Sequence, residues 1–117
     1  MDKTVLIDGK SINFRMNASF AYAYEGQFGE DIFQVLFPLL GEAAGETDFI
    51  KRLSLKKIQN IIWTMAKLYD DSIDEPKVWF ASFECFLVDS VVPELLSLFL
   101  SSFVSKKKSN LTREAIQ

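Results

Sequence analysis

The chain has 117 residues, of which 49% are hydrophobic and 14% aromatic, and 11 of them are phenylalanines. This apolar content excludes a disordered chain and is enough for one domain with a buried core. The net charge of -3 is too small to favour nucleic-acid binding, and the absence of histidine removes histidine-dependent nucleophile pairs and the commonest transition-metal ligand.

The first predicted element is a β-hairpin near the N-terminus. The sequence TVLIDGKSINFRM alternates around Asp8 and Gly9, a pair that is typical of a tight two-residue turn. The apolar residues expected to face the core are Val5, Ile7, Ile12 and Phe14. A lone hairpin is only marginally stable in water, so helices must cover it.

A first helix is predicted up to about Phe28, with Asn17 or Ser19 as its N-terminal cap. Phe20, Tyr24 and Phe28 are spaced by four, which places three aromatic side chains on one stripe of the helix. This spacing predicts that the stripe faces the core.

A second helix is predicted after Gly29, a residue typical of the C-terminal end of a helix. Glu30 and Asp31 would lie at the start of the new helix, where acidic side chains are favourable. Its apolar residues are Ile32, Phe33, Val35, Leu36, Leu39 and Leu40. The acidic segment GEAAGETD, residues 41–48, is the best candidate for a loop.

The clearest helical pattern lies in SLKKIQNIIWTMAKLYDD, with Ser54 as the expected cap. One face carries Leu55, Ile58, Ile62, Met65 and Tyr69, widened by Ile61, Ala66 and Leu68. The other side carries Lys56, Asn60, Lys67 and also Trp63. A tryptophan on the polar side is either covered by another element or offered to a partner.

The C-terminal part of the chain predicts a short helix that starts at Pro76 and a long apolar helix within residues 85–105. Pro93 should kink the long helix or mark its true start. Its narrow polar stripe consists of Ser90, Glu94, Ser97 and Ser101. So little polar surface indicates deep burial or packing on another chain. We expect residues 1–105 to form one domain and residues 106–117 to be a polar, mobile tail.

No catalytic, cofactor-binding or metal-binding site is predicted. The acidic residues Asp70, Asp71, Asp74 and Glu75 lack the glycine and the downstream glutamate of a calcium loop, so a solvated helix end is expected. Cys85, the single cysteine, is expected to be a core thiol in a reducing compartment. The three lysines at 106–108 are expected to be a basic helix terminus.

Residues 86–104 raise the alternative of a tail-anchored membrane protein. The segment is nearly apolar, and a spanning helix needs ~20 such residues. However, Asp89 and Glu94 lie within it, and an acid near the bilayer centre costs ~2.5–3.5 kcal/mol. Binding to a membrane is therefore disfavoured. The N-terminal sequence MDKTVLIDGK lacks the basic-then-apolar pattern of a secretory signal, so export by that route is not expected.

From about residue 4 to about residue 104 the chain resembles the phage tail assembly chaperones of siphophages and prophages of Gram-positive bacteria. The resemblance rests on four segments in order: IDGKSINFR, YEGQFGEDIFQVL, IIWTMAKLYDDSI with a Trp-bearing segment after it, and VVPELLSLF. In that family a DGK-type hairpin precedes a "Y…FG.DI" turn, a helix ending in MAK and a helix of the PEI type. These signatures are architectural and not catalytic.

The elements taken together predict a mainly α-helical fold in which the N-terminal β-hairpin precedes four to five helices in one small domain. The resemblance implies a non-enzymatic role in the cytoplasm of the bacterial host. Such a protein binds the tape measure protein and helps to recruit tail tube subunits. Family members are often made in a short form and a frameshifted longer form, whereas the C-terminal end here departs from the family pattern.

We expect the wide apolar face of residues 86–104 to be offered to this client or to a second copy of the chain. The residues expected to bind a partner are Trp63, Leu95, Leu98, Phe99 and Phe103. A small enzyme is a third, disfavoured possibility, because no set of polar residues converges on one place.

Overall fold

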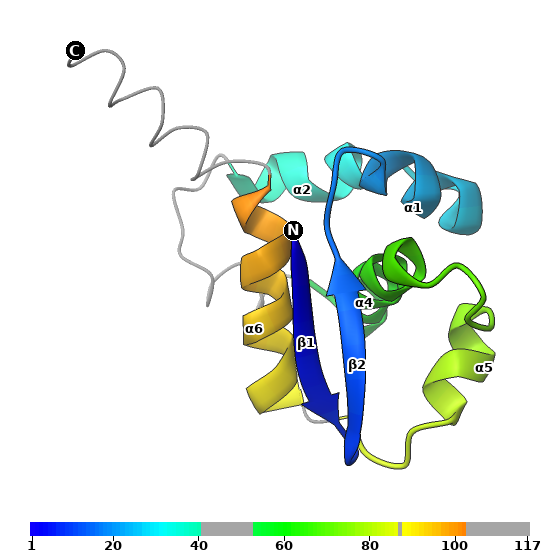
Figure 1. The fold of residues 1–117 in the computed structure, drawn as a ribbon. Coiled ribbons are helices and arrows are strands. Elements are labelled where there is room, and N and C mark those ends of the chain that lie inside the picture. The colour runs from blue at the N-terminus through cyan, green and yellow to red at the C-terminus, as the bar shows by residue number, and fades with distance from the viewer. Residues whose placement is uncertain (41–52, 87, 103–117) are drawn as a thin grey trace, which may run out of the picture.

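The computed structural model describes residues 1–40, 53–86 and 88–102 (Figure 1). This part of the chain forms a β-hairpin followed by five helices, so the expected mainly α-helical fold is confirmed. The elements are β1 (Asp2–Ile7), β2 (Lys10–Arg15), α1 (Phe20–Phe28), α2 (Ile32–Leu40), α4 (Leu55–Tyr69), α5 (Pro76–Ala81) and α6 (Val88–Ser101). The predicted loop at 41–48 and the tail at 106–117 lie outside the described residues.

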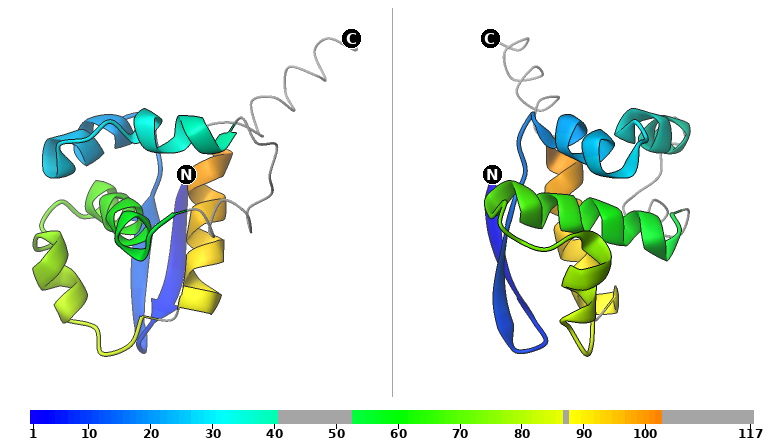
Figure 2. Two further views of the ribbon diagram at one scale, coloured as in Figure 1. Left: turned by 180° about the vertical axis from the view of Figure 1, so that it is seen from behind. Right: turned by 90° about the vertical axis from the view of Figure 1, so that its right-hand side faces the viewer.

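The helices gather on one side of the hairpin, as the two views of Figure 2 show. α6 runs beside β1, and α4 packs against β2. α1 and α2 lie across the end of the hairpin that is opposite its turn. α5 lies beyond α4, at the edge of the fold away from α6. The core is therefore enclosed by the inner face of the hairpin and by the helices that cover it.

The hairpin has the predicted two-residue turn. β1 and β2 are antiparallel, and Val5 pairs with Ile12 while Ile7 pairs with Lys10. The two turn residues both have positive φ, 54° at Asp8 and 77° at Gly9, which is the geometry of a type I′ turn. Val5, Ile7 and Phe14 are buried and Ile12 is partly buried, so the predicted inner face is confirmed.

The tip of the hairpin is fastened to the segment that joins α5 to α6. The carboxylate of Asp8 accepts a hydrogen bond from the backbone N–H of Glu84 at 3.1 Å. Lys10 donates to the carbonyl of Ser82 at 3.3 Å and lies 5.3 Å from the centre of the Phe83 ring. These contacts hold the turn against a segment more than seventy residues away in sequence.

Replacing Gly9 with valine should lower the free energy of unfolding by ~1–2 kcal/mol, because a side chain at positive φ is strained. A Cβ at Gly9 would meet no atom within 4 Å, so the loss reports the backbone conformation and not a clash. Gly26→Ala is the matched control: it lies inside α1, also with nothing within 4 Å, and should stabilise slightly. Urea denaturation measures both, and an unchanged stability in the valine variant would contradict the turn geometry.

The break between α1 and α2 is built by local polar contacts. Gly29 has a φ of 69° and its N–H donates to the carbonyl of Glu25, which ends α1 as predicted. The carboxylate of Asp31 accepts a hydrogen bond from the N–H of Phe33 at 2.9 Å, which caps the start of α2. At the start of α1, Ser19 occupies the cap position without a side-chain cap bond, and Asn17 instead accepts from the N–H of Ser19 at 2.8 Å.

α4 is the central helix of the core. The hydroxyl of Ser54 accepts a hydrogen bond from the N–H of Lys57 at 3.2 Å, so the predicted cap is confirmed. Its buried residues are Ile58, Ile61, Ile62, Trp63, Thr64, Met65 and Ala66. Leu55 and Tyr69, at the two ends of the predicted stripe, are 51% and 41% exposed, because the stripe is longer than the core that covers it.

α5 begins with Pro76 in its first turn, as predicted. α6 begins at Val88 and contains Pro93, so the proline does not mark the start of the helix. The expectation that Cys85 is a core thiol is wrong: Cys85 is exposed. It lies between the two helices, where the neighbouring aromatic residues Phe83 and Phe86 pack against the core in its place.

Candidate partner-binding site

The residues predicted to bind a partner do not form one exposed surface. Trp63, Leu95 and Phe99 are buried inside the monomer. Leu98 is partly buried, and Phe103 lies outside the described residues. The expectation that α6 offers its apolar face to a partner is corrected for Leu95 and Phe99, because β1 and α1 cover that face.

The apolar side chains of α6 are buried in the core of the domain. Val91, Val92, Leu95, Leu96 and Phe99 all belong to the core cluster. The ring of Phe99 lies 5.1 Å from the ring of Phe20 in α1. Glu94 and Ser97 of the polar stripe are exposed, whereas the apolar side of the helix is covered.

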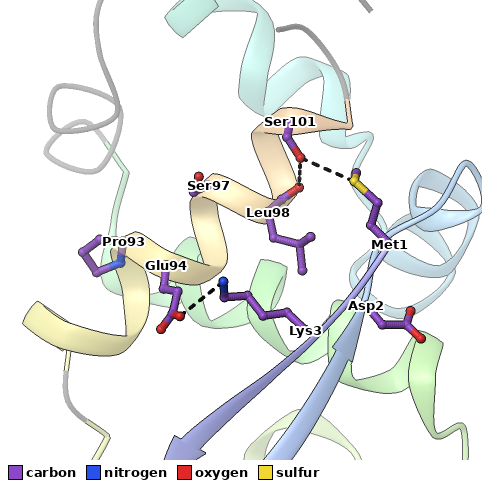
Figure 3. A pocket seen from close by; sticks show the side chains of 8 residues that line it. All are labelled: Met1, Asp2, Lys3, Pro93, Glu94, Ser97, Leu98 and Ser101. Carbon is purple, nitrogen blue, oxygen red and sulfur yellow. Dashed lines mark hydrogen bonds and ion pairs between the residues drawn. The ribbon is translucent and has the colours of Figure 1, made fainter. Parts of the chain in front are cut away.

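The part of α6 that remains accessible forms a cleft with β1 (Figure 3). The cleft has a volume of about 680 Å³ and is lined by Met1, Asp2, Lys3, Pro93, Glu94, Ser97, Leu98 and Ser101. Lys3 and Glu94 form an ion pair across it at 3.2 Å. Because Lys3 and Glu94 neutralise each other, neither charge is free to bind a partner. The apolar contacts that the cleft can still make come mainly from Leu98 and the exposed Met1.

Trp63 has a structural role. Its indole N–H donates to the carbonyl of Asp74 at 2.9 Å, and its ring meets Phe28 edge-on with the centres 5.7 Å apart. The neighbouring Lys67 donates to the carbonyls of Asp71 and Ile73. Trp63 and Lys67 therefore fasten the acidic 70–75 segment to α4, which in turn sets the position of α5.

A second, more apolar groove lies between α4, α5 and the end of α1. Its volume is about 560 Å³, and its lining residues are Phe28, Leu55, Lys56, Gln59, Asn60, Pro76, Lys77 and Phe80. We call it the α4–α5 groove. Sequence patterns did not point to it, because its walls come from three helices whose relative placement depends on the contacts of Trp63 and Lys67.

An exposed aromatic pair lies on α2. Phe33 and Phe37 are 51% and 64% exposed, and their ring centres are 5.2 Å apart. Ile32 and Leu36, one position earlier in each case, are buried. α2 thus carries two apolar stripes of the same spacing, and only one of them can face the core. This doubled stripe is the sequence signal that could have identified the exposed pair.

A polar network ties the segment between α1 and α2 to α1 and to α4. The hydroxyl of Tyr24 donates to the carboxylate of Glu30 at 2.7 Å, and Lys57 in α4 forms an ion pair with the same carboxylate. Burial raises the pKa of the Tyr24 hydroxyl, and the hydrogen bond to Glu30 adds to the rise. The hydrogen bond from Lys57 lowers the pKa of Glu30. The network is a structural tie that joins α1 and α4 through Glu30.

The interactions of Glu30 should make the free energy of unfolding depend on pH. Because its folded pKa lies below the ordinary value of 4.5, its contribution is complete above that value and is lost as the pH falls through the folded pKa. Glu30→Gln should therefore lose stability relative to the parent at pH 7 and lose less of it at pH 3. Urea denaturation at both pH values tests this, with Glu25→Gln on α1 as the control. An equal loss at the two pH values would contradict the tie.

The acidic segment and the possible metal and membrane sites can be checked within the described residues. No group of three Cys, Asp or Glu side chains there could hold a metal ion. Asp70 ends α4, and its carboxylate accepts hydrogen bonds from the N–H and hydroxyl of Ser72, which lower its pKa. Asp70, Asp71, Asp74 and Glu75 are all exposed, so the predicted solvated helix end is confirmed. Across residues 1–40, 53–86 and 88–102 there is no helix with the length and apolarity needed to span a membrane.

Comparison with known proteins does not assign the chain to a family. No protein-family model matches it, and neither a curated protein nor a solved structure is significantly similar to it.

Proposed function

We propose that this protein is a non-enzymatic phage tail assembly chaperone. In this role it binds the tape measure protein and helps to recruit tail tube subunits in the cytoplasm of the bacterial host. The proposal rests on the resemblance of the four ordered sequence segments, and it is supported by how those segments fold. The DGK segment forms the turn of a hairpin, and FGEDI forms the hinge between α1 and α2.

The observation that carries the proposal is the exposed pair Phe33 and Phe37 on α2. Scattered exposed apolar residues are ordinary on a protein surface. Two phenylalanines that touch on one helical face are different, since aromatic residues are enriched at the centres of protein interfaces. A chaperone needs such a surface in order to shield apolar segments of a long helical client.

Co-purification with the tape measure protein encoded by the same phage or prophage tests the proposal. We expect the tagged parent protein to retain this client, and Phe33→Ser combined with Phe37→Ser to reduce the amount retained. Leu6→Ser is the matched control, since Leu6 is 66% exposed on the outer face of the hairpin. Failure of the parent to retain the client would refute the function, and equal retention by the α2 variant would refute the surface.

Self-association belongs to the same proposal. We expect a homo-oligomer that dissociates when the client binds, with the α2 pair at the contact in place of the buried face of α6. Light scattering across a concentration series, with and without the client, measures this exchange.

A further inference from the structure

We propose that the α4–α5 groove binds an amphipathic α-helix that carries carboxylates beside its apolar stripe. This site is distinct from the α2 pair and from the cleft at α6. Assigning the helix to the tape measure protein rests on the proposed function, whereas the chemistry of the groove does not.

The charges of the groove are unbalanced. In the described part of the chain four lysines are engaged: Lys3 and Lys57 with carboxylates, and Lys10 and Lys67 with carbonyls and aromatic rings. The other two, Lys56 and Lys77, have neither an ion pair nor a hydrogen bond there, and both line the α4–α5 groove. No carboxylate lines it. The groove therefore gathers the two lysines for which this part of the chain provides no partner.

The position of Lys56 adds to this imbalance. It is the second residue of α4, and the first turn of α4 contains no acidic residue. The N-terminal end of a helix disfavours a cation and favours an anion. A carboxylate brought by a partner would thus be stabilised by the lysine and by the end of the helix together.

The floor of the groove is apolar and already formed. Phe28 and Phe80 are partly buried, and Leu55 is half exposed. α5 is held at its distance from α4 by the hydrogen bond from Trp63 to the carbonyl of Asp74. A partner can consequently bury an apolar stripe without the cost of first opening the site.

The walls favour a helix over an extended strand as the occupant. An extended segment needs the free N–H and C=O groups of a sheet edge, and all lining residues belong to helices. A helix satisfies its own backbone and needs only side-chain contacts. Lys56 comes from α4 and Lys77 from α5, so the two cations can meet carboxylates on the two flanks of a bound helix.

The test uses a synthetic helical peptide of about 20 residues, long enough to form an isolated helix. Its leucines follow a 3-4 spacing, and glutamates flank them; a control peptide carries lysine at every glutamate position. Titration into the ¹⁵N-labelled full chain should shift the amide signals of Leu55, Lys56, Lys77 and Phe80. The lysine peptide should bind much more weakly.

Variants make the assignment specific. Lys56→Gln combined with Lys77→Gln should weaken binding of the glutamate peptide by ~3–10-fold at low salt, the range expected for two exposed ion pairs. Lys3→Gln removes the same charge outside the groove and should leave the affinity unchanged. The proposal is overturned by equal affinity of the groove variant and the parent, by equal binding of the two peptides, or by shifts confined to other surfaces. Binding of a single-stranded oligonucleotide in place of the peptide would overturn it as well.

The same variants separate this inference from the proposed function. Retention of the tape measure protein by the parent, with no loss in the groove variant, would leave the function standing and refute the groove as the client site. Binding of the glutamate peptide in the groove without retention of the tape measure protein would support the groove and refute the proposed function.

Discussion

Replacing Phe99 with aspartate should leave the protein largely unfolded at 25 °C. Phe99 is fully buried and its ring contacts Phe20. Truncating a buried phenylalanine alone lowers stability by ~3–5 kcal/mol, and the aspartate adds the unfavourable burial of a carboxylate. The sum is comparable to the whole stability of an ordinary small domain. Loss of the far-UV circular dichroism signal and of cooperative thermal unfolding would confirm the expectation.

Leu98→Asp, one residue earlier, is the matched control. Leu98 is only partly buried, at the cleft beside β1, so its carboxylate can reach water. This variant should keep a cooperative transition and a well-dispersed NMR spectrum. If both variants fold equally well, α6 is not packed against the core as the structure shows.

Ile62→Ala in α4 is the second large effect, with an expected loss of ~2–5 kcal/mol in the free energy of unfolding. Ile62 is fully buried at the centre of the helix that packs on β2. A well-packed site of this kind cannot collapse around the missing atoms, so a cavity remains.

Leu55→Ala supplies the comparison for Ile62→Ala on the same helix. Leu55 follows the same apolar stripe but is 51% exposed, so its truncation should cost less than ~1 kcal/mol. Urea denaturation of both variants, fitted with the same dependence of the unfolding free energy on urea concentration, gives the difference between their two losses. A loss below ~0.5 kcal/mol for Ile62→Ala would mean that α4 turns another face to the core.

Most elements of this fold follow from local signals in the sequence. The DG pair specifies a turn that needs two positive φ angles, and Asp8 and Gly9 adopt them. Ser54 and Gly29 are typical of helix ends, and each ends or caps its helix as expected. Such signals act over one turn of chain, so no knowledge of the rest of the fold is needed to interpret them.

The surfaces could not be predicted in the same way, because they depend on which elements meet. The apolar face of α6 is covered by β1 and α1, which lie far from it in the sequence. Trp63, on the polar side of α4, is covered because the 70–75 segment folds back to its indole N–H. The same non-local packing leaves Phe33 and Phe37 outside while Ile32 and Leu36 go inside.

The contacts of the hairpin set an order of events during synthesis on the ribosome. Asp8 bonds to a residue 76 positions later, and β1 is covered by α6, which starts at Val88. At a translation rate of ~5–20 residues per second, the apolar face of the hairpin waits ~4–15 s for its last cover. Such distant contacts also slow folding. Nascent chains that stop before α6 therefore display Val5 and Ile7 to proteases and to other nascent chains, and β1 is covered only when α6 emerges.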